Sequence, residues 1–145
     1  MKTLQEVRDY LAQIPYINNG GCGVAAYAMY QWLKSNNQLD PDFKFVMCYM
    51  GCYEDVYMNN LRVIREKDGN AIACSHIAIW NCDKVIDCDN EINLPRYSYV
   101  QFVQEEWFIL NALNNIDTWN FRFDREHITT IEKKLKINLS QINKS

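Results

Sequence analysis

The sequence predicts a single α+β domain. Apolar residues recur at helical spacing near both ends of the chain, whereas β-branched and aromatic runs separated by short turns fill its middle. The chain has 145 residues, of which 48% are hydrophobic and 23% charged, so it is long enough and apolar enough to bury one core. We expect this domain to span residues 1–140, followed by a polar tail at residues 141–145.

Two helices are predicted in the first quarter of the chain. Four apolar residues share one helical face: Leu4, Val7, Leu11 and Ile14. Thr3 is a suitable N-cap for this first helix, and Pro15 would end it. A second helix is predicted over residues 22–35, because this stretch is rich in alanine and other good helix formers. It is apolar on most sides, so we expect it to be central and buried.

The middle of the chain predicts strands. Residues 43–49 are β-branched and aromatic and indicate a strand, whereas residues 53–66 fit either a helix or, in part, a strand. A strand is predicted over residues 71–80. It would turn back into a short strand at residues 85–87, forming a hairpin with a four-residue loop.

Further elements are predicted in the last third of the chain. Residues 100–115 fit a helix, and residues 119–123 alternate apolar and polar side chains as a strand does. A last helix is predicted over residues 125–137, with Asp124 as its N-cap.

Charge and composition argue against several functional classes. The formal net charge is −3, unlike the basic surface of a general nucleic-acid binder, so we expect no nucleic-acid partner. No apolar run is long enough to span a membrane, and charges in the first ten residues do not fit a signal peptide. We therefore expect a cytoplasmic protein. In such a protein the six cysteines are more often core residues, metal ligands or a nucleophile than disulfides.

The candidate nucleophile is Cys22, within the segment Gly20-Gly21-Cys22-Gly23 that opens the second predicted helix. Glycines allow a sharp turn and a close approach of a ligand to the backbone. The first turn of a helix carries unpaired N–H groups and the positive end of the dipole. Both stabilise a thiolate, which is the reactive form of a cysteine, and the same N–H groups stabilise an oxyanion. A small core cysteine is the structural alternative.

A cysteine nucleophile needs a base, and the chain has two histidines. His76 lies on a predicted strand, where apolar neighbours would hold its ring in one orientation. His127 lies on a predicted surface helix, where we expect a solvated residue. His76 is therefore the candidate base, with a buried core histidine as the alternative interpretation.

The candidate third residue is Asp87. If Trp80 pairs with Val85 across the hairpin, both Asp87 and Asp89 lie on the face of His76. Either carboxylate would then accept the His76 Nδ1–H and fix the tautomer of the ring. A slip of one residue in the register would remove both from that face. Asp87 is preferred because it follows the strand directly, although a residue that merely begins a turn remains the alternative.

These motifs resemble the papain-like cysteine hydrolases in the broad sense, which include NlpC-type peptidases and transglutaminase-like enzymes. The resemblance covers residues 18–90 and is strongest to the small predicted cysteine peptidases of bacteria and phages. It implies Cys22 as nucleophile, His76 as base and Asp87 as orienting acid. It also implies a helix packed on an antiparallel sheet, no cofactor, and a peptide or protein as substrate.

The chain departs from that family at the oxyanion position. Papain itself carries a glutamine six residues before its cysteine, and Tyr16 stands at that place here. Asn18 or Asn19 is the candidate replacement as an oxyanion donor. The family also includes inactive members, so a non-catalytic binding or inhibitor protein on the same scaffold is the alternative function.

Two other interpretations come from the cysteines and the aromatic residues. Five cysteines, together with His76, offer the ligand types of a zinc site: Cys48, Cys52, Cys74, Cys82 and Cys88. None of them forms a closely spaced C-x-x-C pair. We therefore expect no metal. Trp107, Phe108 and Trp119 would suit an exposed binding surface, although we expect them to fill the core.

Overall fold

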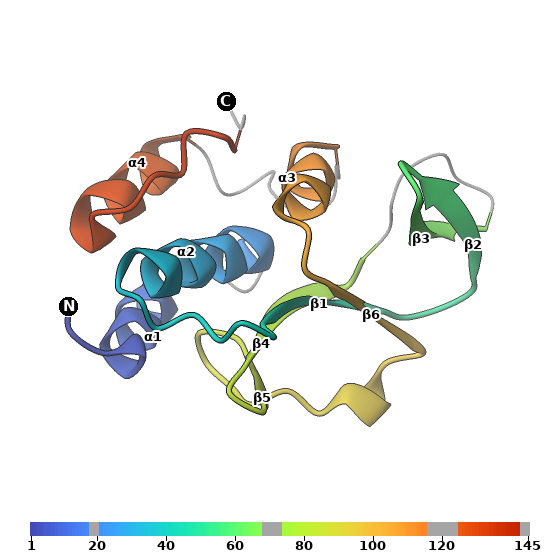
Figure 1. Cartoon of the computed structure of the whole chain (residues 1–145), viewed down its shortest axis with the longest axis horizontal. Coiled ribbons are helices and arrows are strands. Elements are labelled where there is room, and N and C mark those ends of the chain that lie inside the picture. Colours follow the sequence, from blue (N-terminus) through green and yellow to red (C-terminus); the bar gives the residue numbers. More distant parts are fainter. Residues whose placement is uncertain (18–20, 68–73, 116–124, 143–145) are drawn as a thin grey trace.

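A computed structural model describes residues 1–17, 21–67, 74–115 and 125–142 of the chain. It has the predicted α+β class, with helices gathered over one face of an antiparallel sheet (Figure 1). The elements, in chain order, are α1 (Leu4–Ala12), α2 (Cys22–Ser35), β1 (Lys44–Tyr49), β2 (Tyr53–Met58), β3 (Leu61–Glu66), β4 (His76–Asn81), β5 (Lys84–Ile86), a 3₁₀ helix (Leu94–Arg96), β6 (Tyr99–Val103), α3 (Glu106–Asn115) and α4 (Arg125–Leu135).

The main sheet has the strand order β5-β4-β1-β6, and every neighbouring pair is antiparallel. The two central strands are buried because both of their faces are covered. Helix α2 packs on one face, and side chains of the segment before β6, including Ile92 and Tyr97, cover the other. The register pairs Cys48 of β1 with His76, so His76 begins β4 at one end of the sheet.

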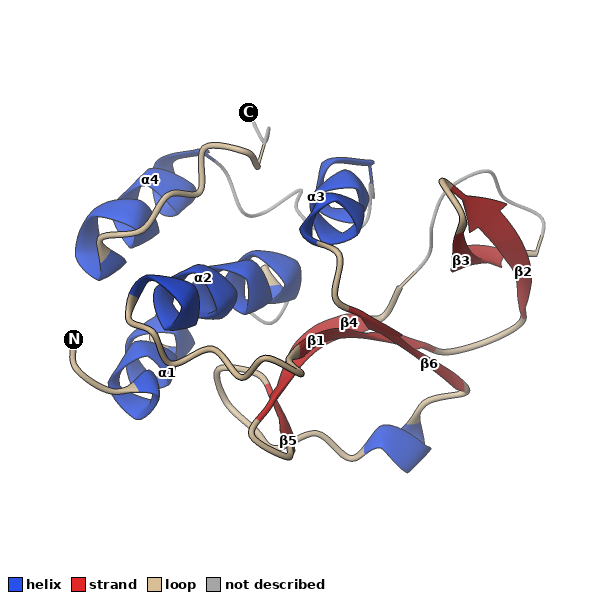
Figure 2. Cartoon of the chain, in the orientation of Figure 1, coloured by secondary structure: helices blue, strands red, loops and turns tan. Residues whose placement is uncertain are grey.

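Helix α2 is the central helix that the sequence predicts. It begins at Cys22 and ends at Ser35, and all of its residues are buried except Gln31, Lys34 and Ser35. It contacts β4 as well as α1, α3 and α4, which lie around it (Figure 2). A helix that is apolar on nearly all sides is stable only when other elements enclose it, and this arrangement meets that requirement.

The first helix is also confirmed. The Thr3 hydroxyl accepts the backbone N–H of Glu6 at 3.1 Å, which is the predicted N-cap. Helix α1 ends at Ala12, before Pro15.

The C-terminal helix α4 matches the predicted helix, but the core reaches farther along the chain. Leu139 and Ile142 are both fully buried, so the domain extends at least to Ile142, which lies within the tail predicted at residues 141–145. The predicted strand at residues 119–123 and the proposed cap Asp124 lie outside the described residues.

The predicted helix over residues 100–115 is wrong in its first part. Residues 99–103 form the edge strand β6, which pairs with β1, and the helix α3 begins only at Glu106. The β-branched and aromatic residues Val100, Phe102 and Val103 favour a strand once β1 offers hydrogen-bonding partners.

Two hairpins turn through residues with left-handed backbones. Asn59 and Asn60, with φ values of 50° and 69°, join β2 to β3, so the ambiguous stretch at residues 53–66 is a β-hairpin. Cys82 and Asp83, with φ values of 51° and 67°, join β4 to β5. The predicted four-residue loop is therefore a two-residue turn, because Asn81 and Lys84 also pair.

Candidate active site

The three predicted catalytic residues lie at the ends of three elements. Cys22 is the first residue of α2, His76 is the first residue of β4, and Asp87 follows the last residue of β5. Helix α2 packs on β4, and β4 pairs with β5, so the core fixes the relative positions of these ends. Side chains held by packed elements keep their geometry better than side chains on long loops.

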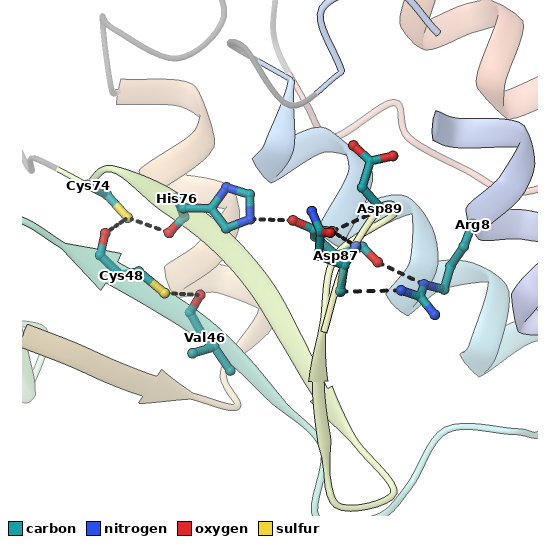
Figure 3. A network of polar contacts seen from close by, with 8 residues as sticks. Arg8, Val46, Cys48, Cys74, His76, Asp87 and Asp89 are labelled. Atoms are coloured by element: carbon teal, nitrogen blue, oxygen red, sulfur yellow. Dashed lines mark hydrogen bonds and ion pairs between the residues drawn. The ribbon is translucent and has the colours of Figure 1, made fainter. Parts of the chain in front are cut away.

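The His76 ring is hydrogen-bonded to Asp87. The His76 Nε2–H donates to Asp87 Oδ2 at 2.9 Å, and the two side chains are only 12% and 6% exposed (Figure 3). The expectation that Nδ1 faces the carboxylate is wrong. The carboxylate lies on the neighbouring strand, and the outer ring nitrogen spans the gap between the two strands. Nδ1 is thereby left for a second partner.

Asp87 also holds its own turn. Its Oδ1 accepts the backbone N–H groups of Asp89 and Asn90 at 2.7 and 2.6 Å. The predicted register, with Trp80 opposite Val85, is confirmed. Of the two carboxylates that this register left open, Asp87 is the His76 partner. Asp87 therefore both begins a turn and binds the histidine, which the sequence analysis treated as alternatives.

The environment of the pair favours charge on both members. Burial by itself lowers the pKa of His76, but hydrogen bonds and charge interactions with Asp87 and Cys22 raise it from 6.5 to about 9. Burial raises the pKa of Asp87, but hydrogen bonds from His76, Asn90 and Asp89 bring it below its ordinary value of 3.8. At neutral pH the pair is therefore an imidazolium and a carboxylate.

Cys22 also interacts with His76. A hydrogen bond between its side chain and His76 contributes to the raised pKa of the histidine. Cys22 is buried, with 6% of the residue exposed. The first intrahelical bond of α2 runs from the Ala25 N–H to the Gly21 carbonyl at 2.9 Å. The Cys22 N–H precedes this ladder and lies where a helix offers donors to an anion.

The oxyanion donors predicted from the side chains, Asn18 and Asn19, lie outside the described residues. Tyr16, at the position of the family's glutamine, has a left-handed backbone with φ 65° and is 53% exposed. Within the part of the chain that the structure describes, the backbone N–H groups at the N-terminus of α2 are donors that could bind an oxyanion.

A polar cavity of about 640 Å³ opens beside the pair. Met50, Ser75, His76 and Asp87 line one part of it, and most residues of the segment 89–97 line the rest. The sequence analysis did not predict this segment as part of a site. It reaches the site because its apolar residues cover the outer face of the sheet, which leaves its polar residues facing the cavity.

The other cysteines do not form a metal site in the described part of the chain. No group of three or more His, Cys, Asp or Glu side chains could hold a metal ion among these residues. Cys52 and Cys82 are exposed. The Cys74 thiol donates to the carbonyls of Cys48 and His76 at 3.3 and 3.1 Å. Burial raises the pKa of Cys48 to about 12 and that of Cys74 well above its ordinary value.

The remaining candidates lie elsewhere. His127, on α4, is half-buried and lines a separate depression with Tyr10, so it is less solvated than predicted. Trp107 is 41% exposed, whereas Phe108 is fully buried as expected, and Trp119 lies outside the described residues. No helix in the described ranges has the length and hydropathy that a membrane crossing requires.

The arrangement has the parts of a nucleophilic site: a thiol at a helix N-terminus, a histidine that contacts it, and a carboxylate that orients the histidine. Sequence reasoning missed Arg8, which binds the turn of Asp87 from α1. In the sequence, only the spacing of Asp87, Asp89 and Asn90, which is typical of a turn capped by a side chain, indicates that this loop is ordered.

Comparisons of the chain with protein-family models, curated proteins and solved structures found no match.

Proposed function

We propose that this protein is a papain-like cysteine hydrolase or acyl transferase that acts on an amide or thioester bond. Cys22 is the nucleophile, His76 the general acid and base, and Asp87 the orienting carboxylate. The observation that carries the proposal is the buried hydrogen bond of 2.9 Å between His76 Nε2 and Asp87 Oδ2, on a ring that also contacts Cys22.

The layout of the elements supports the papain-like assignment. The cysteine begins a central helix, and this helix packs on an antiparallel sheet whose strand β4 begins with the histidine. A structural core cysteine would need neither a histidine partner nor a carboxylate bound to that histidine. Burying the His76–Asp87 pair also carries a desolvation cost, which a catalytic role would account for.

The proposed reaction starts from a Cys22 thiolate beside the His76 imidazolium. The thiolate sulfur attacks the acyl carbon, and the Cys22 N–H binds the oxyanion that forms. His76 gives its proton to the leaving amine or thiol, and the carbon–nitrogen or carbon–sulfur bond breaks to leave a thioester on Cys22. Neutral His76 then takes a proton from water or an amine, which attacks the thioester and releases the sulfur.

The cavity favours a peptide-like substrate over a lipid acyl chain. Its lining includes the carboxylates of Asp89 and Glu91, the amides of Asn90 and Asn93, and the guanidinium of Arg96. Pockets for hydrocarbon chains are lined mainly by apolar side chains, whereas these groups offer partners to polar substrate groups of either charge. We therefore propose an amide or isopeptide bond of a peptide or protein as the substrate.

Thiol labelling tests the proposal without a known substrate. The wild-type protein and His76→Ala are treated with iodoacetamide between about pH 5 and pH 9, and the alkylation rate of each cysteine is read by mass spectrometry. Cys22 should react faster than exposed Cys52 below neutral pH, despite being buried, and His76→Ala should remove this advantage. Cys74 is the reference for a buried thiol with a raised pKa.

An acyl donor extends the test from reactivity to chemistry. p-Nitrophenyl acetate should acetylate Cys22 and release p-nitrophenolate in a burst, and Cys22→Ser should abolish the burst. Slow labelling of Cys22 at every pH, with no acetylated Cys22, would overturn the enzymatic proposal. A non-catalytic binding protein on the same scaffold would then be the better interpretation.

A further inference from the structure

Arg8 binds the turn that carries Asp87. It projects from α1, and its Nε–H donates to the Asp87 carbonyl at 2.8 Å, while its Nη2 donates to the Asn90 carbonyl at 3.3 Å (Figure 3). These two carbonyls belong to the first and last residues of the turn. One guanidinium therefore joins both ends of the turn to a helix that lies 79 residues earlier in the chain.

The turn that Arg8 binds follows β5 directly, and the chain on its far side pairs back with this strand. Ile86 forms a bridge with Glu91, and the Ile92 N–H donates to the Val85 carbonyl at 2.8 Å. Strand β5 has three residues, and Ile86 is its last. Within the turn, the Asp87 N–H donates to the Asn90 carbonyl at 3.0 Å, and Asp87 Oδ1 accepts two backbone N–H groups. Arg8 thus holds the carbonyls at the two ends of the turn, while the N–H groups of Asp89 and Asn90 hold Oδ1 from within it. The carboxylate is then fixed with Oδ2 toward His76.

We propose that Arg8 is a positioning residue for the active site: by holding the carbonyls of Asp87 and Asn90, it keeps Asp87 Oδ2 in hydrogen-bonding distance of His76 Nε2. The inference rests on the proposed function, because it assigns Arg8 a role in the same reaction. Arg8 donates to the turn and to Gln5, so we expect its effect on the reaction to pass through Asp87.

The role is geometric rather than electrostatic. The main influences on the pKa of Asp87 are burial, His76 and the N–H groups of Asn90 and Asp89, whereas Arg8 binds the Asp87 carbonyl rather than its carboxylate. A guanidinium donates in two directions from a rigid plane, whereas a lysine ammonium offers a compact charge on a flexible stem. Arg8→Lys should therefore keep the charge but lose the simultaneous contact with the two carbonyls.

The matched control is Gln5→Ala. Gln5 lies one turn earlier on α1, and its side-chain oxygen accepts from Arg8 Nη1 at 3.2 Å. This variant alters the same helix and a contact of the same guanidinium, but it leaves both bonds to the turn intact. Arg8→Ala, Arg8→Lys and Gln5→Ala are compared with the wild type after circular dichroism has verified that each is folded.

The first readout is the titration of His76 by NMR of protein labelled at its histidines. The chain has two histidines, so His127 is an internal reference in every sample. The titratable groups that contribute most to the pKa of His76 are Asp87, directly after β5, and Cys22 on α2. Cys74 binds the His76 carbonyl, and Asp89, Glu91 and Tyr97 line the same cavity. We expect the His76 midpoint, near 9 in the wild type, to fall by about 1 to 2 units in both Arg8 variants and to stay in place in Gln5→Ala.

The second readout is alkylation of Cys22 by iodoacetamide at about pH 6, which should slow roughly tenfold or more in both Arg8 variants. An unchanged His76 midpoint in a folded Arg8→Ala would overturn the positioning role, whatever the reactivity of Cys22. Full retention of the midpoint in Arg8→Lys would overturn the geometric explanation. If the midpoint falls but wild-type Cys22 proves inert, the proposed function fails while the positioning of Asp87 by Arg8 stands.

Discussion

Asp87 binds His76 with one carboxylate oxygen and its own turn with the other. Oδ2 accepts the His76 Nε2–H at 2.9 Å, and Oδ1 accepts the N–H groups of Asp89 and Asn90. A carboxylate satisfied on both oxygens has little freedom to rotate, so it fixes the plane and the tautomer of the histidine ring. The ring is thereby held with Nδ1 available to the thiol of Cys22.

Substitutions at Asp87 should separate these two tasks. Asp87→Asn keeps a side-chain oxygen for the turn but removes the charge beside the imidazolium, so the pKa of His76 should fall and Cys22 should alkylate more slowly at about pH 6. Asp87→Ala should do the same and also lose stability by about 1 to 3 kcal/mol, because two N–H groups lose their acceptor. Urea unfolding and cysteine labelling measure the two effects. Equal stability of the two variants would show that the turn does not depend on the side chain.

The stability of the fold should depend on pH through the His76–Asp87 pair. The raised pKa of His76 contributes stability that is complete below 6.5 and is lost as the pH rises through about 9. The lowered pKa of Asp87 contributes stability that is present above 3.8 and is lost as the pH falls through its folded value. Both contributions to stability are therefore complete only between about pH 3.8 and pH 6.5.

Urea unfolding at about pH 5.5, 7 and 9.5 measures this dependence. The wild type should lose stability between the first and last of these values. His76→Ala should lose clearly less over the same interval, whereas His127→Ala, as the matched control, should follow the wild type. A His76→Ala profile parallel to that of the wild type would mean that the pair is not the source of the dependence.

The parts of the site that rest on local patterns could be predicted from the sequence. The glycines before Cys22 and the alanine-rich run after it mark the start of α2. The register that brings Asp87 to His76 follows from a turn of two residues, because a hairpin between adjacent strands needs no long-range information. The residues that determine each of these features lie within about ten positions of one another along the chain.

The features of the fold and the site that the sequence did not predict depend on contacts between distant segments. The strand β6 was predicted as a helix because its pairing with β1, more than fifty residues earlier, is not visible in a local window. Arg8 could not be assigned because its partners are backbone carbonyls, which every residue carries. The ring nitrogen that faces Asp87 depends on the distance between two strands, and sequence spacing does not give that distance.

Glu106 should be important for stability because it joins α3 to the central helix. It accepts the hydroxyls of Tyr27 and Tyr30 at 2.5 and 3.2 Å. Burial, followed by the charge of Glu106, raises the pKa of Tyr30 to about 12, so both tyrosines stay protonated donors at neutral pH. Glu106→Ala should lower the free energy of unfolding by about 1 to 3 kcal/mol, because two hydroxyls in the core lose their acceptor.

Glu106→Gln is the control, since it keeps an acceptor of the same length and should cost less than Glu106→Ala. Urea unfolding measures both variants, and the same samples can be tested for alkylation of Cys22. The network lies in the interface between α2 and α3, so we expect Cys22 reactivity in folded Glu106→Gln to match the wild type. A loss of reactivity there would mean that the position of α3 affects the N-terminus of α2.

The turn between β4 and β5 should become more stable when Cys82 is replaced by asparagine. Cys82 has a left-handed backbone with φ 51°, and this conformation costs an ordinary residue about 1 to 2 kcal/mol, whereas asparagine adopts it more readily. The Cys82 N–H donates to Asp40 Oδ2 at 3.1 Å, and the substitution keeps that donor. Cys82→Asn should therefore raise the free energy of unfolding by about 0.5 to 1 kcal/mol.

Cys52→Asn makes the same chemical change at an exposed position without positive φ and should have a smaller effect. Because this turn sets the register that brings Asp87 to the face of the sheet that carries His76, Cys82→Val should destabilise the fold and also slow the alkylation of Cys22. Normal reactivity of Cys22 in a destabilised Cys82→Val would show that the register is maintained by the core rather than by the turn.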